Sequence, residues 1–97
     1  MVIITPQPLK KFMAAHPDSA SNIKQWMAAV KLANWGTPNE LKAVYPNASL
    51  VANDRVVFNI GGNKYRLVVR IVYPVRTIFI RFIGTHSAYD LVDVATV

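Results

Sequence analysis

Apolar residues in the first part of the chain recur every three or four positions, which is the spacing of one helix face. Ile23, Trp26 and Val30 form such a stripe, with lysines on the other side. Prolines mark helix ends, because a missing N–H is harmless in a first turn but disrupts a helix interior. We therefore expect, in chain order, a strand at Val2–Thr5, a helix from Pro6 to Pro17, a second helix from Asp18 or Ser19 to Asn34, and a helical turn at Glu40–Val44 that follows the capping box Thr37-Pro38-Asn39-Glu40.

From Ser49 onward the pattern changes to the alternation typical of strands. Gly61-Gly62-Asn63 predicts a tight hairpin, because glycine and asparagine tolerate positive φ. Gly84 is expected to end the last strand. The tail that follows, Thr85–Val97, is expected to be short and to contain one helical turn. The expected strands are Leu50–Ala52, Arg55–Ile60, Lys64–Tyr73 and Arg76–Ile83.

These elements predict one α+β domain over residues 1–97. We expect an N-terminal helical hairpin on one face of a twisted, mainly antiparallel sheet of about four or five strands, with the N-terminal strand at an edge. Alternation assigns the strand side chains to two faces. The apolar face under the helices should contain Val56, Phe58, Ile60, Tyr65, Leu67, Val69, Ile71, Tyr73, Ile78, Ile80 and Phe82. The other face should contain Arg55, Val57, Asn59, Lys64, Arg66, Val68, Arg70, Val72, Phe79, Arg81 and Ile83.

The chain is strongly basic, and the second face carries five of its eleven basic residues. Eleven Lys and Arg against five Asp and Glu give a formal net charge of +6. Between Arg55 and Tyr89 there are Lys and Arg but no Asp or Glu. This balance fits a nucleic acid, an anionic membrane surface or an acidic protein as partner, and equally a set of solvated strand residues. A membrane-binding amphipathic helix is disfavoured, because the basic residues fall in predicted strands.

Several chemistries lack the residues that they need. The chain has no cysteine, which excludes disulfides, thiolate metal sites and cysteine nucleophiles. Two histidines, His16 and His86, are too few for zinc, and the basic half offers no carboxylate for Mg²⁺ before Asp90 and Asp93. We find no glycine-rich phosphate loop and no transmembrane or secretory segment. We therefore expect a cytoplasmic protein with no metal, no cofactor and no membrane partner.

A basic protein without a metal can still cleave RNA, because the ribose 2′-hydroxyl is an internal nucleophile beside the phosphate. The protein must orient the backbone, move two protons and stabilise charge on the phosphate. Histidine transfers protons near neutral pH, and His86 is the only histidine in the basic half. Tyr89 would share its face on a helix. Taken alone, His86 could equally be a surface or helix-capping histidine. Tyr89 could equally be an aromatic ring at the edge of the core.

Several motifs recur here in an order and at separations found in one known family. The chain resembles HigB toxins of type II toxin–antitoxin systems, which are members of the RelE-like superfamily, over essentially its whole length. The residues that carry the resemblance are Asn59–Val68, Phe79–His86, Tyr89-Asp90, Leu41–Pro46 and Leu9-Lys10. The resemblance implies a RelE-like fold and cleavage of mRNA in the ribosomal A site. It also implies neutralisation by a HigA-type helix-turn-helix antitoxin, with operator DNA contacted only through that antitoxin.

The resemblance also implies roles for individual residues. Arg66 matches the strand arginine that stabilises the scissile phosphate, with Lys64 and Arg81 as supporting phosphate contacts. His86 and Tyr89 match the positions used for proton transfer or substrate orientation, and RelE-like enzymes differ in which residue is the base. The remaining candidates, for contact with mRNA or ribosomal RNA, are Arg55, Asn59 and Arg70.

Two other functions fit the same residues. A non-catalytic module could use the basic face to bind RNA or the ribosome and block translation without cutting. A structural protein could use it to pair with an acidic chain. A ribosome-dependent endoribonuclease, giving 2′,3′-cyclic phosphate and 5′-hydroxyl ends, is our leading hypothesis.

Overall fold

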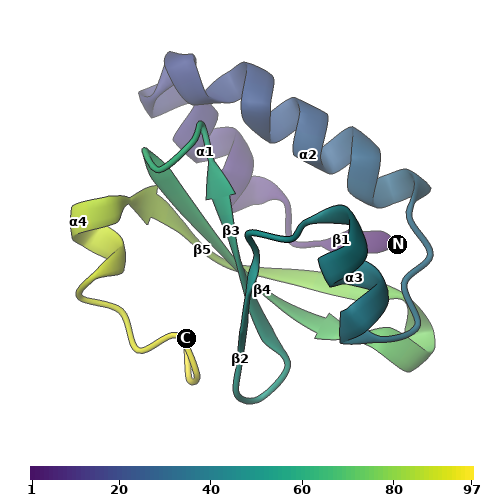
Figure 1. Ribbon diagram of the computed structural model, residues 1–97. Coiled ribbons are helices and arrows are strands. Elements are labelled where there is room, and N and C mark those ends of the chain that lie inside the picture. Colours follow the sequence, from purple (N-terminus) through teal and green to yellow (C-terminus); the bar gives the residue numbers. More distant parts are fainter.

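The computed structural model describes all residues, 1–97, as helices packed on a five-stranded mixed sheet (Figure 1). The strand order is β1-β5-β4-β3-β2, so the N-terminal strand lies at an edge, as expected. β1 pairs with β5 in parallel, and the other neighbours are antiparallel. The strands are β1 Val2–Ile4, β2 Ser49–Val51, β3 Arg55–Ile60, β4 Tyr65–Val72 and β5 Thr77–Thr85. The α+β class predicted from the sequence is confirmed.

The helices also begin and end close to the predicted residues. They are α1 Gln7–Ala15, the 3₁₀ turn Pro17–Ser19, α2 Ala20–Leu32, α3 Pro38–Val44 and α4 His86–Tyr89. Thr37 caps α3 as the sequence predicts, since its Oγ1 accepts the Glu40 N–H at 3.3 Å. Ser19 precedes α2 but does not cap it, because its hydroxyl donates to the His16 carbonyl instead. None of the helices has the length and apolar character needed to cross a membrane.

The main core lies between the helices and the sheet. Leu67 and Ile71 on β4 are fully buried, together with Ile23 of α2, Leu9 of α1 and Leu41 of α3. Leu67 packs in the middle of the sheet, with neighbours on both β3 and β5. The more specific prediction of a helical hairpin is not confirmed: a 3₁₀ turn joins α1 to α2, and α1 packs mainly against β5.

A β-bulge in β5 changes which residues face the core. The β4–β5 register shifts between Val68 and Val69, so that Phe82 pairs with Val68 and Ile80 with Val69. Arg81 is the extra residue, and every side chain after it changes face. The predicted places of Phe82 and Ile83 are therefore exchanged: Ile83 packs against the core and Phe82 lies on the opposite face.

Gly84 does not end the last strand, which was the prediction, but lies within β5 opposite Arg66. Its lack of a side chain is needed for packing rather than for a turn. A Cβ built there would come within 2.6 Å of Cζ of Phe82, which is closer than real Cβ atoms approach. Gly84 was predicted to break the strand, whereas it makes room for an aromatic ring on the same strand.

The C-terminal segment covers part of the second face of the sheet (Figure 1). Residues 90–97 run back across this face, where Asn53 Nδ2 donates to the Ala95 carbonyl at 3.0 Å. Val57 and Val68 lie on this face, away from the helices, yet they are only 3% and 0% exposed. The tail that follows α4 is thus a packed part of the domain.

Candidate active site and RNA-binding face

Arg66 lies on β4, on the sheet face opposite to α1, α2 and α3, next to the β3–β4 hairpin. Its guanidinium Nη1 donates to the Asn63 carbonyl at 3.1 Å and to the Tyr65 carbonyl at 3.3 Å. Its Cζ lies 6.0 Å from the centroid of the Tyr89 ring, a distance at which a cation and an aromatic face attract each other. Nη2 and Nε have no protein partner, so the planar donor group remains available to a phosphate.

His86 is the first residue of α4, two positions after Gly84, the β5 residue opposite Arg66. Its Nδ1 lies 3.2 Å from Oδ2 of Asp90, one helical turn later, and the two side chains are 55% and 57% exposed. Thr85 caps this short helix by accepting the Ala88 N–H at 3.2 Å. The sharp change from strand to capped helix therefore places Tyr89 beside Arg66, with His86 three residues earlier on the same short helix.

Arg81 and Arg55 both bind the C-terminal segment. Arg81 Nε and Arg55 Nη2 donate to the Val97 carbonyl oxygen, at 3.1 Å and 2.7 Å. Arg55 is 9% exposed, and its Nη1 donates to the Asn53 carbonyl. Arg70, the cross-strand partner of Arg55, is exposed and makes no side-chain hydrogen bond. These three arginines form a second basic group, on the same face as Arg66.

Lys64 does not share the face of Arg66, which was the prediction from strand alternation. It lies in the hairpin turn just before β4, and its ammonium binds the carboxylate of Asp18, on the side of the helices. The Tyr65 hydroxyl donates to the same carboxylate at 2.7 Å. The hydrogen bonds from Lys64 and then Tyr65 hold the pKa of Asp18 below its ordinary value. In return, the carboxylate raises the pKa of Lys64.

Acid titration should reveal this cluster. Because the pKa of folded Asp18 lies below 3.8, its carboxylate stabilises the fold above that pH, and this stabilisation is lost as the pH falls through the folded pKa. We expect the free energy of unfolding to fall less steeply below pH 3.8 in Asp18→Asn than in the wild type. Urea unfolding at a series of pH values measures this. Asp54→Asn is the control, because the Asp54 carboxylate forms no salt bridge, and an equal effect of both substitutions would contradict the expectation.

The structure thus brings together three of the predicted catalytic residues, Arg66, His86 and Tyr89. Asn59 lies beside them as the cross-strand partner of Arg66. Sequence reasoning assigned no role to Asp90, although its spacing of four residues from His86 on a helix was a usable signal. No three His, Asp or Glu side chains converge in a way that could hold a metal ion.

Residues 19–92 match the family of HigB toxins, described as the RelE-like toxic component of a toxin–antitoxin system. The chain belongs to this family, and the resemblance inferred from the motifs is confirmed. Over 92 residues it is 28% identical to the mRNA interferase toxin HigB of Escherichia coli strain K12, covering 93% of this chain and 88% of the relative. It is also 26% identical to the mRNA interferase HigB of Escherichia coli O6:H1, covering 93% and 89% of the two chains.

Proposed function

We propose that this chain is a metal-independent endoribonuclease that cleaves mRNA by attack of a 2′-hydroxyl on the adjacent phosphate. The observation that carries the proposal is the grouping of Arg66, Tyr89 and His86 on the basic face of the sheet, with His86 paired to Asp90. Two of the relatives that the chain resembles are named mRNA interferases, which agrees with this chemistry. The expected products carry a 2′,3′-cyclic phosphate and a 5′-hydroxyl.

Arg66 is the group best placed to stabilise the phosphate. Its two free donor nitrogens can bind two phosphate oxygens at once, and the bonds strengthen as negative charge builds up in the transition state. The Asn63 and Tyr65 carbonyls hold the guanidinium in one orientation before the substrate arrives. A pre-positioned cation of this kind costs little reorganisation during the reaction.

His86 is the group best placed to take or give a proton. When the Asp90 carboxylate accepts the Nδ1–H of the ring, the other ring nitrogen is left as an acceptor that faces solvent. This is the form that a general base for the 2′-hydroxyl needs. Tyr89, whose ring centroid lies 6.0 Å from Cζ of Arg66, then orients the substrate or protonates the leaving 5′ oxygen.

The second basic group extends the surface available to RNA. We propose that Arg55, Asn59 and Arg70 contact mRNA or ribosomal RNA, and that Arg81 supports the phosphate through its two Nη groups, which have no partner. Lys64 would contribute only after leaving Asp18. The same proposal includes action in the ribosomal A site in the cytoplasm, and neutralisation by a HigA-type antitoxin that alone contacts operator DNA.

The test is mapping of transcript 5′ ends after brief induction of the wild type and of His86→Ala. We expect cuts inside translated reading frames in the wild type, and about 10²–10⁴-fold fewer cuts in the variant, because a general base contributes that much. Blocking translation should abolish the cuts if the ribosome is required.

Ser87→Ala is the matched control, since Ser87 is an exposed neighbour on α4 without a side-chain contact. Its pattern of cuts should equal that of the wild type. Growth arrest with intact transcripts in every strain would contradict the nuclease proposal. It would instead favour a non-catalytic module that blocks translation. Fragments with a 5′ phosphate would exclude attack by the 2′-hydroxyl.

A further inference from the structure

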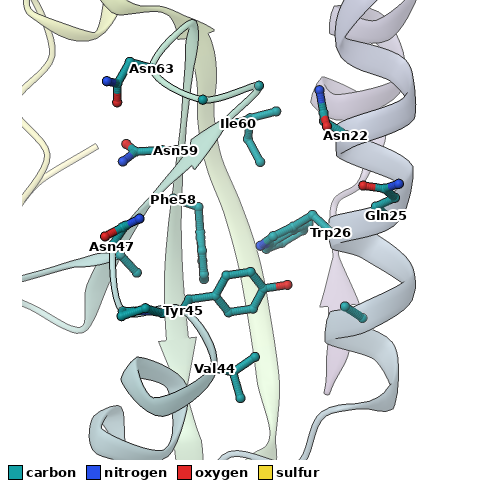
Figure 2. A pocket seen from close by; sticks show the side chains of 15 residues that line it. Asn22, Gln25, Trp26, Val44, Tyr45, Asn47, Phe58, Asn59, Ile60 and Asn63 are labelled. Atoms are coloured by element: carbon teal, nitrogen blue, oxygen red, sulfur yellow. The ribbon is translucent and has the colours of Figure 1, made fainter.

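An uncharged pocket of about 660 Å³ opens between α2 and the free edge of β3 (Figure 2). β2 pairs with β3 only as far as Val57, so the outer edge of Phe58–Ile60 has no strand partner. The volume falls in the range of about 300–1,000 Å³ that is usual for small-molecule sites. Although the whole chain carries +6, no Lys, Arg, His, Asp or Glu lines this pocket. Its chemistry is therefore unlike that of the basic sheet face.

Aromatic rings and carboxamides line the pocket together. Trp26 packs edge-on against Phe58, with ring centroids 5.3 Å apart, and Tyr45 also packs edge-on against Phe58 at 5.2 Å. Burial raises the pKa of Tyr45, which keeps its hydroxyl neutral. The carboxamides around these rings are those of Asn22, Gln25, Asn47, Asn59 and Asn63. Planar surfaces beside groups that both donate and accept hydrogen bonds are what an unstacked nucleobase requires.

Trp26, a lining residue of the pocket, carries a hydrogen-bond donor that the protein itself does not pair. Its side chain is 3% exposed, and its indole N–H has no acceptor in the protein. A buried donor without a partner is costly and rare, and a binding site is one reason for retaining it. Figure 2 shows the indole reaching from α2 toward Phe58 across the pocket. Because the nitrogen itself is shielded from solvent, a carbonyl oxygen or ring nitrogen of a ligand would reach this donor only after a shift of the neighbouring rings.

The pocket adjoins the proposed phosphate site through the hairpin. Asn63 lines the pocket, and its carbonyl accepts the Arg66 guanidinium at 3.1 Å. Asn59, another lining residue, is the cross-strand partner of Arg66. One RNA strand crossing the hairpin could therefore place a phosphate at Arg66 and a neighbouring base against α2.

We propose that this pocket binds one unpaired base of the RNA substrate and so contributes to the choice of the cleavage position. That the base comes from substrate RNA rests on the proposed function. The chemistry of the pocket itself does not depend on it. The lack of any charged lining residue favours the base over the sugar-phosphate backbone, which the arginines of the open face would hold instead.

The test is an NMR titration of the intact protein with adenosine, guanosine, cytidine and uridine separately, and then with single-stranded ribotrinucleotides. We expect a saturable shift of the Trp26 indole N–H with at least one nucleoside, and a smaller response of Trp35, which does not line the pocket. Asn22→Ala should weaken this binding about fivefold, as expected for the loss of one hydrogen bond. Asn22 is exposed on α2, so the variant should fold normally.

Ser21→Ala is the matched control, because Ser21 is an exposed polar neighbour on α2 outside the pocket. No shift of Trp26 with any nucleoside or trinucleotide would overturn the proposal. A shift produced equally by ribose 5-phosphate would overturn recognition of the base. The proposed function is judged separately: if Arg66→Ala does not lower the affinity for the trinucleotide, the phosphate site is wrong, whatever the nucleosides show.

Discussion

Replacing Arg66 with alanine is expected to lower the rate of RNA cleavage about 10²–10³-fold, the effect of removing one pre-positioned donor from a charged transition state. Stability should stay close to that of the wild type, because Arg66 bonds only to carbonyl groups at the partly exposed hairpin. The rate of transcript cleavage after induction, together with thermal unfolding of the purified variant, separates the two effects.

Arg66→Lys refines the same expectation. Lysine keeps the charge but loses the planar pair of donors, so cleavage should recover only in part. Lys31→Ala removes a positive charge from the exposed surface of α2 and is the control for net charge. Wild-type cleavage by Arg66→Ala would show that the catalytic phosphate binds elsewhere on the protein.

Replacing Leu67 with alanine should have the largest effect on stability. Leu67 follows Arg66 directly but points to the other face, where it is fully buried between Phe58 on β3 and Ile83 on β5. A buried leucine truncated in this way costs about 3–5 kcal/mol, a large share of the roughly 5–15 kcal/mol that stabilises a typical domain. Urea unfolding measures the loss, and growth arrest should disappear with the folded protein.

Leu91→Ala is the control for this second expectation, because the Leu91 side chain is 89% exposed. Its free energy of unfolding should remain within about 0.5 kcal/mol of that of the wild type. If Leu67→Ala unfolded at the same urea concentration as Leu91→Ala, the assignment of the sheet faces would be wrong.

The sequence pattern was a good guide wherever one signal acted alone. Alternation located β3, β4 and β5, and prolines located the ends of α1 and the start of α3. Gly61 and Gly62 have φ of 64° and 68°, as the predicted hairpin required. These features are local, so a few neighbouring residues determine them.

The errors came from contacts between distant parts of the chain. Alternation cannot reveal the bulge at Arg81, which depends on the pairing of β5 with β4 and exchanges the faces of Phe82 and Ile83. Nor can it reveal that Asp18, far away in sequence, holds Lys64 away from Arg66. The pairing of His86 with Asp90 was accessible in principle, since it needs only a helical turn.

The parallel pairing of β1 with β5 affects how the chain folds while it is being synthesised. Val2 is made long before its partner Thr77, which is made only after β2, β3 and β4. At about 5–20 residues per second, β1 waits several seconds before it can join the sheet. α4, with His86, emerges later still. All five strands must therefore be synthesised before the proposed nuclease site can form.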